Sequence, residues 1–308
     1  LNELICGSNP LGEVDLSNNT ALTSLSIGSS QLTSLDLSNN TSLTSLICHL
    51  NGLTSLDVSA NTALTTITCR DNNLTELVLS NNTALTNLWC YGNQLTSLDV
   101  SSNTALTFLD CYENQFTSLD VSSNTALNDL RCGSNQLTSL DVSSNTALTF
   151  LDCYDNQLTA LDVSSNTALE VLHCNDNQLT SLDVSSHTAL NELYCNNNLL
   201  TYLNMRNGLT DQYTEGSTTN NSLTCIEVLD PAWATANWTS SNGNIDIDAG
   251  VTFDVICGAE AQTHWYVATT GSDASGSGTL ASPLATIQTG INATTEDDTV
   301  SVAAGTYT

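Results

Sequence analysis

Lysine is absent from this chain of 308 residues, and only three basic residues occur, Arg70, Arg131 and Arg206. Against them stand 32 aspartates and glutamates, so the formal net charge is −29. A protein that binds nucleic acid needs a cationic face for the phosphates, and an anionic membrane surface would repel this chain for the same reason. The charge balance therefore argues against nucleic acid and anionic membrane surfaces as partners.

Long hydrophobic runs are also missing, so we expect no membrane-spanning helix. The helix formers Lys, Glu, Met and Gln are scarce, whereas Ser, Thr, Asn and Asp abound. Charged residues make up 11% of the chain and hydrophobic residues 40%, which favours a folded core over a disordered acidic tail. The composition is typical of turns and short strands.

A 21-residue repeat runs from Leu1 through residue 210 without an insertion, which gives ten turns. Each turn has two halves, LxxLxCxxNx and LxxLDVSSNTA. In LxC and LDV the outer two residues point inward and the middle one outward, as strand alternation requires. One turn cannot bury its own leucines, so turns stack and pair. We predict an all-β solenoid with two short strands per turn.

This pattern resembles the nested 21-residue class of bacterial leucine-rich repeats, LxxLxCxxNxLxxLDLxxN. The resemblance spans residues 1–210 and implies a right-handed solenoid of ten turns. Departures are few: Ile27 replaces a cysteine, Phe116 a leucine and His187 an asparagine. No secretory signal precedes Leu1, where the pattern is already under way, so we expect a mature fragment of a longer protein.

Two columns of asparagine recur once per turn where the chain leaves a strand, and their amides can bond backbone groups that lack partners. One column comprises Asn51, Asn72, Asn93, Asn114, Asn135, Asn156, Asn177 and Asn198; the other comprises Asn19, Asn40, Asn61, Asn82, Asn103, Asn124, Asn145 and Asn166.

Nine of the eleven cysteines occupy inward strand positions, namely Cys6, Cys48, Cys69, Cys90, Cys111, Cys132, Cys153, Cys174 and Cys195. We expect them to pack as small buried hydrophobes, with some disulfides or a metal site as alternatives. Cys225 and Cys257 lie outside the array, and we expect a disulfide between them in a terminal cap, which fits an oxidising compartment.

Three domains are predicted: the solenoid (1–210), a cap and linker (211–262), and a third segment (263–308). Residues 222–258 resemble the C-terminal cap of secreted bacterial repeat arrays, in which Trp233 and Trp238 would cover the open leucine end. Residues 265–308 resemble the opening of a pectate-lyase-like right-handed parallel β-helix. That resemblance implies a short capping helix at Ala285–Ala293 and a first strand at Thr299–Val302, but reaches no catalytic position.

The two halves of the repeat differ in how much they change. The LDVSSNTA half is nearly constant, whereas the outward positions of the other half, here called the variable face, differ from turn to turn and include Asp110, Asp129 and Asp152. Aromatic residues and arginine are common interface anchors, and they gather on this face. The alternative is a drifting solvent face with cross-strand packing. The candidate ligand-binding residues are Trp89, Tyr91, Phe108, Tyr112, Arg131, Phe150, Tyr154, His173 and Tyr194.

The constant half presents a column of outward aspartates, Asp36, Asp57, Asp99, Asp120, Asp141, Asp162 and Asp183. They are expected to be solvated and screened by salt, with Ca²⁺ between turns as the alternative. No other cofactor is expected. The four histidines lie in different contexts and none has a suggestive Ser or Cys nucleophile nearby, and the cysteines point inward, so we expect no enzymatic activity from this chain.

We expect a secreted or cell-surface adhesion module of a larger bacterial protein that binds an extracellular glycan or protein. Two alternatives stay open. In the first, the array is a targeting arm of a polysaccharide-active β-helix enzyme. In the second, it is a structural solenoid that self-associates into filaments or binds ice. The charged aspartate column argues against an ice-binding surface.

Overall fold

The computed structural model describes residues 1–208, 212–238, 244–258, 264–294 and 298–307. It divides into two compact units, Leu1–Leu161 and Asp162–Thr308. Both are built of short parallel strands, and the described residues include only two short helices, α1 (Pro231–Asn237) and α2 (Ile287–Asn292). The predicted all-β solenoid is confirmed. The predicted domain boundaries at 210–211 and 262–263 lie outside the described residues.

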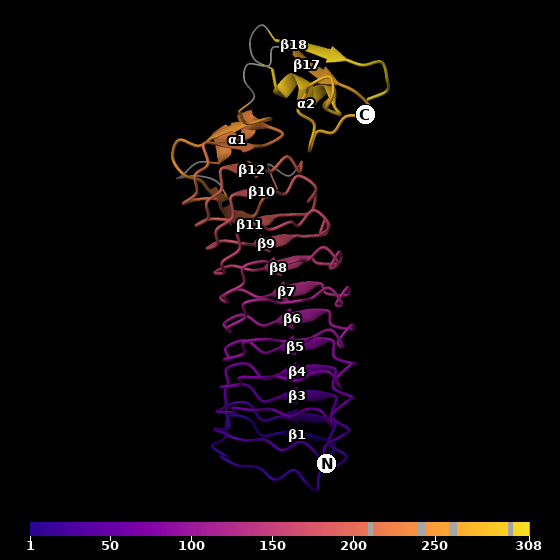
Figure 1. The fold of residues 1–308 in the computed structure, drawn as a ribbon, viewed down its shortest axis with the longest axis vertical. Helices are drawn as coiled ribbons and strands as arrows, with labels where there is room; N and C mark the ends of the chain where they lie inside the picture. Colours follow the sequence, from indigo (N-terminus) through magenta and orange to yellow (C-terminus); the bar gives the residue numbers. More distant parts are fainter. Residues whose placement is uncertain (209–211, 239–243, 259–263, 295–297, 308) are drawn as a thin grey trace. The chain divides into compact units, whose positions relative to one another are not determined.

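The first unit contains eight strands of three residues, each paired in parallel with the next and shifted by one period (Figure 1). They are β1 (Glu3–Ile5), β2 (Ser24–Ser26), β3 (Ser45–Ile47), β4 (Thr66–Thr68), β5 (Asn87–Trp89), β6 (Phe108–Asp110), β7 (Asp129–Arg131) and β8 (Phe150–Asp152).

The second unit contains two stacks of parallel strands and a separate pair. One stack joins β9 (Val171–His173), β11 (Glu192–Tyr194), β13 (Glu215–Ser217) and β15 (Ile245–Asp246). The other joins β10 (Ser181–Asp183), β12 (Tyr202–Asn204), β14 (Cys225–Glu227) and β16 (Thr252–Asp254). The pair consists of β17 (His264–Val267) and β18 (Thr299–Val302).

The prediction of two strands per turn is wrong for residues 1–161, where only the first half of each turn is a strand. In the second half an aspartate carboxylate accepts the backbone N–H of the serine two residues later, as between Asp99 and Ser101 at 2.9 Å. That bond closes a local turn just after LDV but does not by itself prevent a strand, because Asp183 and Ser185 make the same bond at the end of β10. In the second unit the second half does form strands, β10 and β12, and Val184 donates its N–H to the carbonyl of Asn204.

The core follows the inward columns of the repeat. Leucines at the centres of β2, β3 and β5 to β8, such as Leu109 and Leu130, are fully buried. Eight column cysteines from Cys48 to Cys195 are buried and are not in disulfides. Cys6, in the first turn, is half-buried. The asparagines bridge turns as expected, and His187, which replaces one of them, hydrogen-bonds through its ring to the carbonyl of Val163 at 3.0 Å.

The cap packs through aromatic rings. Trp238 is 3% exposed and meets Tyr213, Trp233 and Phe253 edge-on, with ring centroids 5.8, 6.1 and 5.7 Å away. Cys225 and Cys257 form a disulfide with their Cα atoms 5.8 Å apart. The cap therefore combines an aromatic cluster with a covalent link between β14 and the chain that follows β16.

The helix expected within Ala285–Ala293 is α2, capped by Thr286, and the strand expected at Thr299–Val302 is β18. Gly290 of α2 lies against Val267 of β17, where a Cβ atom would approach the Val267 side chain to 2.6 Å. These local elements are confirmed, while a continuing β-helix stays a prediction.

Candidate binding surface

The variable face of the first unit lies on the outward side of β1 to β8. Because strand pairing aligns equivalent positions, residues one period apart lie side by side on strands about 4.8 Å apart. One row across β5 to β8 consists of Trp89, Asp110, Arg131 and Asp152, and the row beside it of Asn87, Phe108, Asp129 and Phe150. The structure thus brings most of the predicted site residues together.

Four of the predicted aromatic residues pack in pairs between neighbouring turns. The rings of Trp89 and Phe108 have centroids 4.6 Å apart, and those of Tyr91 and Tyr112 stack at 4.4 Å with an interplanar angle of 18°. All four side chains are half-buried. The rings therefore stabilise the stacking of turns and still offer part of their surface to a partner.

Tyr154 lies over the backbone of the preceding turn at Gly133. A Cβ atom at position 133 would clash with the Tyr154 ring, so the glycine is what allows this close approach. Gly28 accommodates the His49 ring in the same way. A glycine on the variable face thus makes room for an aromatic ring of the next turn to lie against the backbone.

Arg131 is held from three sides. Its Nε and Nη2 atoms donate to the two carboxylate oxygens of Asp129, each at 2.9 Å. Its guanidinium carbon lies 4.5 Å from the ring centroid of Phe150 and 5.5 Å from that of Phe108. This bidentate ion pair between two rings fixes the guanidinium on the face, and the bond to Asp129 raises the pKa of Arg131.

Asp110 departs from the prediction that the outward side chains are exposed, because its residue is only 4% exposed. Strand alternation gives the side of the sheet, but the bulky neighbours in its row, Trp89 and Arg131, determine how much water reaches it. Burial raises the pKa of Asp110 to about 7, although the nearby Arg131 opposes the shift. Its Oδ1 atom is buried and has no hydrogen-bond partner.

The second unit presents two predicted site residues, His173 on β9 and Tyr194 on β11. The His173 ring meets the Tyr194 ring edge-on with centroids 5.1 Å apart, and its Nε2 atom lies 2.7 Å from the carboxylate of Glu192. Burial, and then the nearby Glu215 carboxylate, raise the pKa of the Tyr194 hydroxyl. These residues form a smaller polar and aromatic patch.

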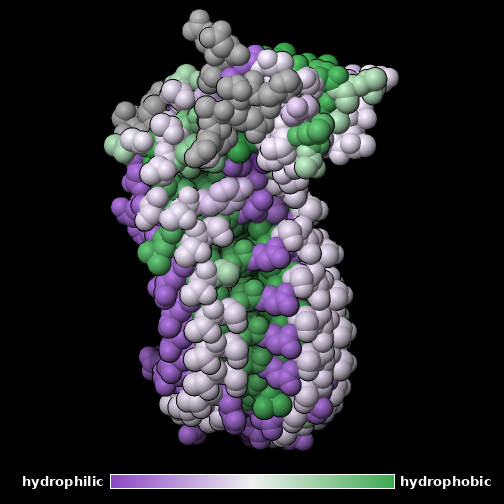
Figure 2. Space-filling view, turned by 45° about the horizontal axis from the view of Figure 1, so that its top comes forward, coloured by the Kyte–Doolittle hydropathy of each residue, from purple (hydrophilic) through white to green (hydrophobic). Residues whose placement is uncertain are grey.

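The constant half is chemically different. The carboxylates of its aspartate column accept hydrogen bonds from serines two residues later, and for Asp120 the bonds from Ser122 lower the pKa. Figure 2 shows hydrophilic residues at regular intervals beside a hydrophobic stripe, as expected of positions that repeat from turn to turn. Within the described residues no three His, Cys, Asp or Glu side chains group as metal ligands would.

A buried ion pair in the second unit was not predicted. Arg206 is 5% exposed and donates to the carbonyls of Ala274 and Gly276 at 2.6 and 3.1 Å, while its Nε atom lies 3.4 Å from the carboxylate of Glu227. Burial raises the pKa of Glu227, against the effect of Arg206. The signal available in the sequence was a single arginine in a long segment without other basic residues.

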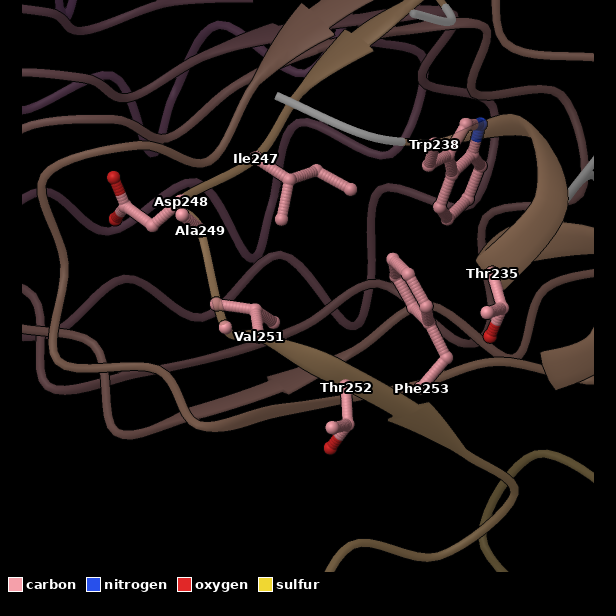
Figure 3. A pocket seen from close by; sticks show the side chains of 9 residues that line it. Thr235, Trp238, Ile247, Asp248, Ala249, Val251, Thr252 and Phe253 are labelled. Atoms are coloured by element: carbon pink, nitrogen blue, oxygen red, sulfur yellow. The ribbon is translucent and has the colours of Figure 1, made fainter. Parts of the chain in front are cut away.

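A hollow in the cap was also missed. In Figure 3 the side chains of Trp238, Ile247 and Phe253 point toward one another across it, while Asp248 is turned away. Its walls come from the chain around α1 and β16, which carry no repeat pattern that sequence analysis could use. Most of the side chains that line the hollow are apolar, among them Trp238, Ile247 and Phe253.

No helix among the described residues is long and apolar enough to cross a membrane. Searches of protein families and of curated proteins find no match to the chain. Solved structures do match.

The chain is similar to the functional domain of InlJ from Listeria monocytogenes, which includes a cysteine ladder, with 37% identity and a TM-score of 0.71 over 83% of this chain and 59% of that one. A leucine-rich repeat protein from Leptospira interrogans shows 27% identity and a TM-score of 0.66 over 73% of this chain and 62% of that one. The ectodomain of a plant membrane receptor kinase from Arabidopsis thaliana, in complex with Casparian strip integrity factor 2, shows 25% identity and a TM-score of 0.61 over 70% of this chain and 30% of that one.

These similarities and the parallel strand stacks define the class: the fold is a leucine-rich repeat solenoid like those of bacterial proteins. The buried cysteine column has a counterpart in the cysteine ladder of InlJ. The chain spans about three fifths of the length of each of the two bacterial structures.

Proposed function

We propose that the chain is a non-enzymatic binding module, secreted or displayed on a bacterial surface within a larger protein, and that it recognises its partner through the variable face. One observation carries the proposal. The same strands that hold the solenoid together present stacked aromatic rings and a clamped arginine on one side, whereas the other half of each turn presents serine, threonine and aspartate.

The ligand class follows from the chemistry of these side chains. Half-exposed rings in rows, one turn apart, suit sugar rings or the apolar side chains of a protein. The high negative charge disfavours anionic polymers, so a neutral or cationic partner fits best. The plant receptor ectodomain with the same fold is in complex with Casparian strip integrity factor 2, which supports a protein partner.

An array of glycans and surface proteins tests the proposal. We expect the variant Trp89→Ala, Tyr112→Ala, Tyr154→Ala to lose at least about tenfold in affinity for whatever ligand the wild type binds, because it removes ring contacts from three turns. The matched control is Asp99→Ala, Asp120→Ala, Asp141→Ala, which alters the same number of residues on the constant half. Equal binding by the aromatic variant and the wild type would place the site elsewhere.

A second candidate function is a targeting arm of a polysaccharide-active enzyme. It is favoured by the parallel pairing of β17 with β18 and by α2, which lie where the β-helix resemblance places its first elements. The same array separates the two candidates: polysaccharide ligands favour the targeting arm, and protein ligands favour adhesion.

A further inference from the structure

The first unit holds an unusual charge arrangement at the centre of the variable face. Asp110, Asp129, Arg131 and Asp152, which we call the central cluster, come from β6, β7 and β8 and combine three carboxyl groups with one guanidinium. The side chains of Asp129 and Arg131 are 18% and 38% exposed, so the cluster lies at the surface of the face, with Asp110 beneath it.

Arg131, the one cation of the central cluster, is already bonded to a carboxylate within the cluster. Arg131 bonds the carboxylate of Asp129 through its Nε–Nη2 edge, which engages two of the five N–H donors of the guanidinium. The Oδ1 atom of Asp110, by contrast, is buried without a hydrogen-bond partner. A buried carboxylate oxygen without a hydrogen-bond partner is costly in free energy, and a cationic donor that reaches it stabilises the group.

The face also shows how it accommodates a guanidinium. Two of the three arginines in the chain lie on it, and both stack on rings: Arg131 over Phe150, and Arg70 with its guanidinium carbon 5.3 Å from the ring centroid of Tyr91. Rings that accept these internal cations offer the same electrostatic attraction to an external one. Beside Asp110 in its row stands Trp89, a half-buried indole.

For a partner to reach Asp110, the side chain of Trp89 or Arg131 must rotate. Both neighbours in the row are partly exposed, so this movement does not require a change in the paired strands. The negative charge of the whole chain would attract a basic partner to the protein, and the contacts on this face would then select it.

We propose that the variable face selects a basic segment of a protein partner, with one arginine or lysine side chain of that segment bound to Asp110 and stacked on the neighbouring rings. This inference rests on the proposed function and names its partner class. Arginine fits better than lysine because its planar guanidinium can bond a carboxylate and stack on a ring at the same time.

Selection from a random peptide library tests the inference. Displayed 12-residue peptides are selected on the wild type at about 0.15 M salt and counter-selected on the variant Trp89→Ala, Tyr112→Ala, Tyr154→Ala, so that only peptides bound by the variable face remain. We expect the survivors to share an arginine or lysine, and we expect replacement of that arginine by citrulline to weaken binding at least about tenfold.

The variant Asp110→Asn keeps the shape of the side chain and removes its charge. It is expected to lose the same factor of about tenfold, with no further loss when the citrulline peptide is used, because both changes remove one interaction. Asp120→Asn on the constant half is the matched control and should bind like the wild type. Thermal unfolding and circular dichroism check that each variant is folded.

The outcomes separate the two proposals. Peptides or array glycans that need the three aromatic residues but bind Asp110→Asn as tightly as the wild type would overturn the cation inference and leave the proposed function standing. Failure to recover any ligand, peptide or glycan, that depends on the aromatic residues would overturn both.

Discussion

At the scale of single residues, the variable face shows that a repeated position does not have a repeated environment. Equivalent outward positions in neighbouring turns hold Trp89, Asp110 and Arg131, and the middle one is buried because the outer two are large. Strand alternation predicted the side on which Asp110 lies. It could not predict burial, which depends on the side chains of the turns before and after.

The raised pKa of Asp110 leads to a prediction about pH and stability. The carboxyl group titrates near 3.8 in the unfolded chain and at about 7 in the folded protein, so between these values the folded state binds more protons. The contribution of this group to the free energy of unfolding is therefore fully present below pH 3.8 and is lost as the pH rises through 7. The difference is on the order of 4 kcal/mol.

We expect Asp110→Asn to be more stable than the wild type at pH 8 and nearly equal to it at pH 4, as measured by urea unfolding across this range. Asp120→Asn is the control with the opposite sign, because hydrogen bonds from Ser122 lower the pKa of Asp120. Its stabilising contribution is present above pH 3.8 and is lost as the pH falls through its lowered pKa. Parallel stability profiles for Asp110→Asn and the wild type between pH 4 and 8 would contradict the assignment.

At the scale of elements, the turns are joined by side chains as much as by strands. The second half of each turn lacks strand pairing in residues 1–161, and the buried asparagines supply connections there. Asn124 is typical: its amide nitrogen donates to the carbonyls of Val100 and Asn103 at 3.0 and 2.9 Å, and both carbonyls belong to the preceding turn. Its Oδ1 atom accepts no hydrogen bond in the described structure.

Replacing Asn124 tests this role. Asn124→Ala removes the side-chain donor from the carbonyls of Val100 and Asn103, which keep their bonds from backbone N–H groups. It should lower the free energy of unfolding by about 1–3 kcal/mol. Asn124→Asp should be worse at neutral pH, because it removes the donor and faces a buried carboxylate toward two carbonyl oxygens. Thr125→Ala, at the exposed neighbouring position, is the control and should cost less than about 0.5 kcal/mol. Urea unfolding gives all three values; similar costs for Asn124→Ala and Thr125→Ala would show that the asparagine does not hold the turns together.

Much of the element pattern could be predicted from the sequence because it depends on local periodicity. The three-residue strands, their register of one period, the buried cysteine column and the asparagine bonds all follow from residues that recur every 21 positions. The extra strand per turn was a wrong prediction for residues 1–161. The alternation in LDV predicts which side chains point inward, but a strand also needs backbone hydrogen bonds to the next turn, such as the one from Val184 to Asn204 in the second unit. The Arg206–Glu227 contact and the hollow beside Trp238 involve non-repeating sequence and could not be predicted.

At the scale of the whole molecule, the eleven cysteines fall into two populations that the fold separates. Eight are buried in the column, Cys6 is half-buried in the first turn, and Cys225 and Cys257 are joined in the cap. Burial also acts on reactivity, because it raises the pKa of Cys69 and of Cys195 to about 12, so almost no thiolate forms at neutral pH. Accessibility and ionisation therefore both protect the column.

A thiol count distinguishes a packed column from a disulfide ladder. In the native protein at neutral pH we expect one thiol, Cys6, to react quickly with an aromatic disulfide reagent and the eight column thiols to react only as fast as the structure opens. In denaturant without reductant the expected count is nine, because the Cys225–Cys257 bond withholds two of the eleven. Reduction before denaturation should raise it to eleven, and the double variant Cys225→Ser, Cys257→Ser should give nine with or without reductant. An unreduced count near one would mean that the column cysteines are paired, and eleven without reductant would mean that the cap disulfide does not form.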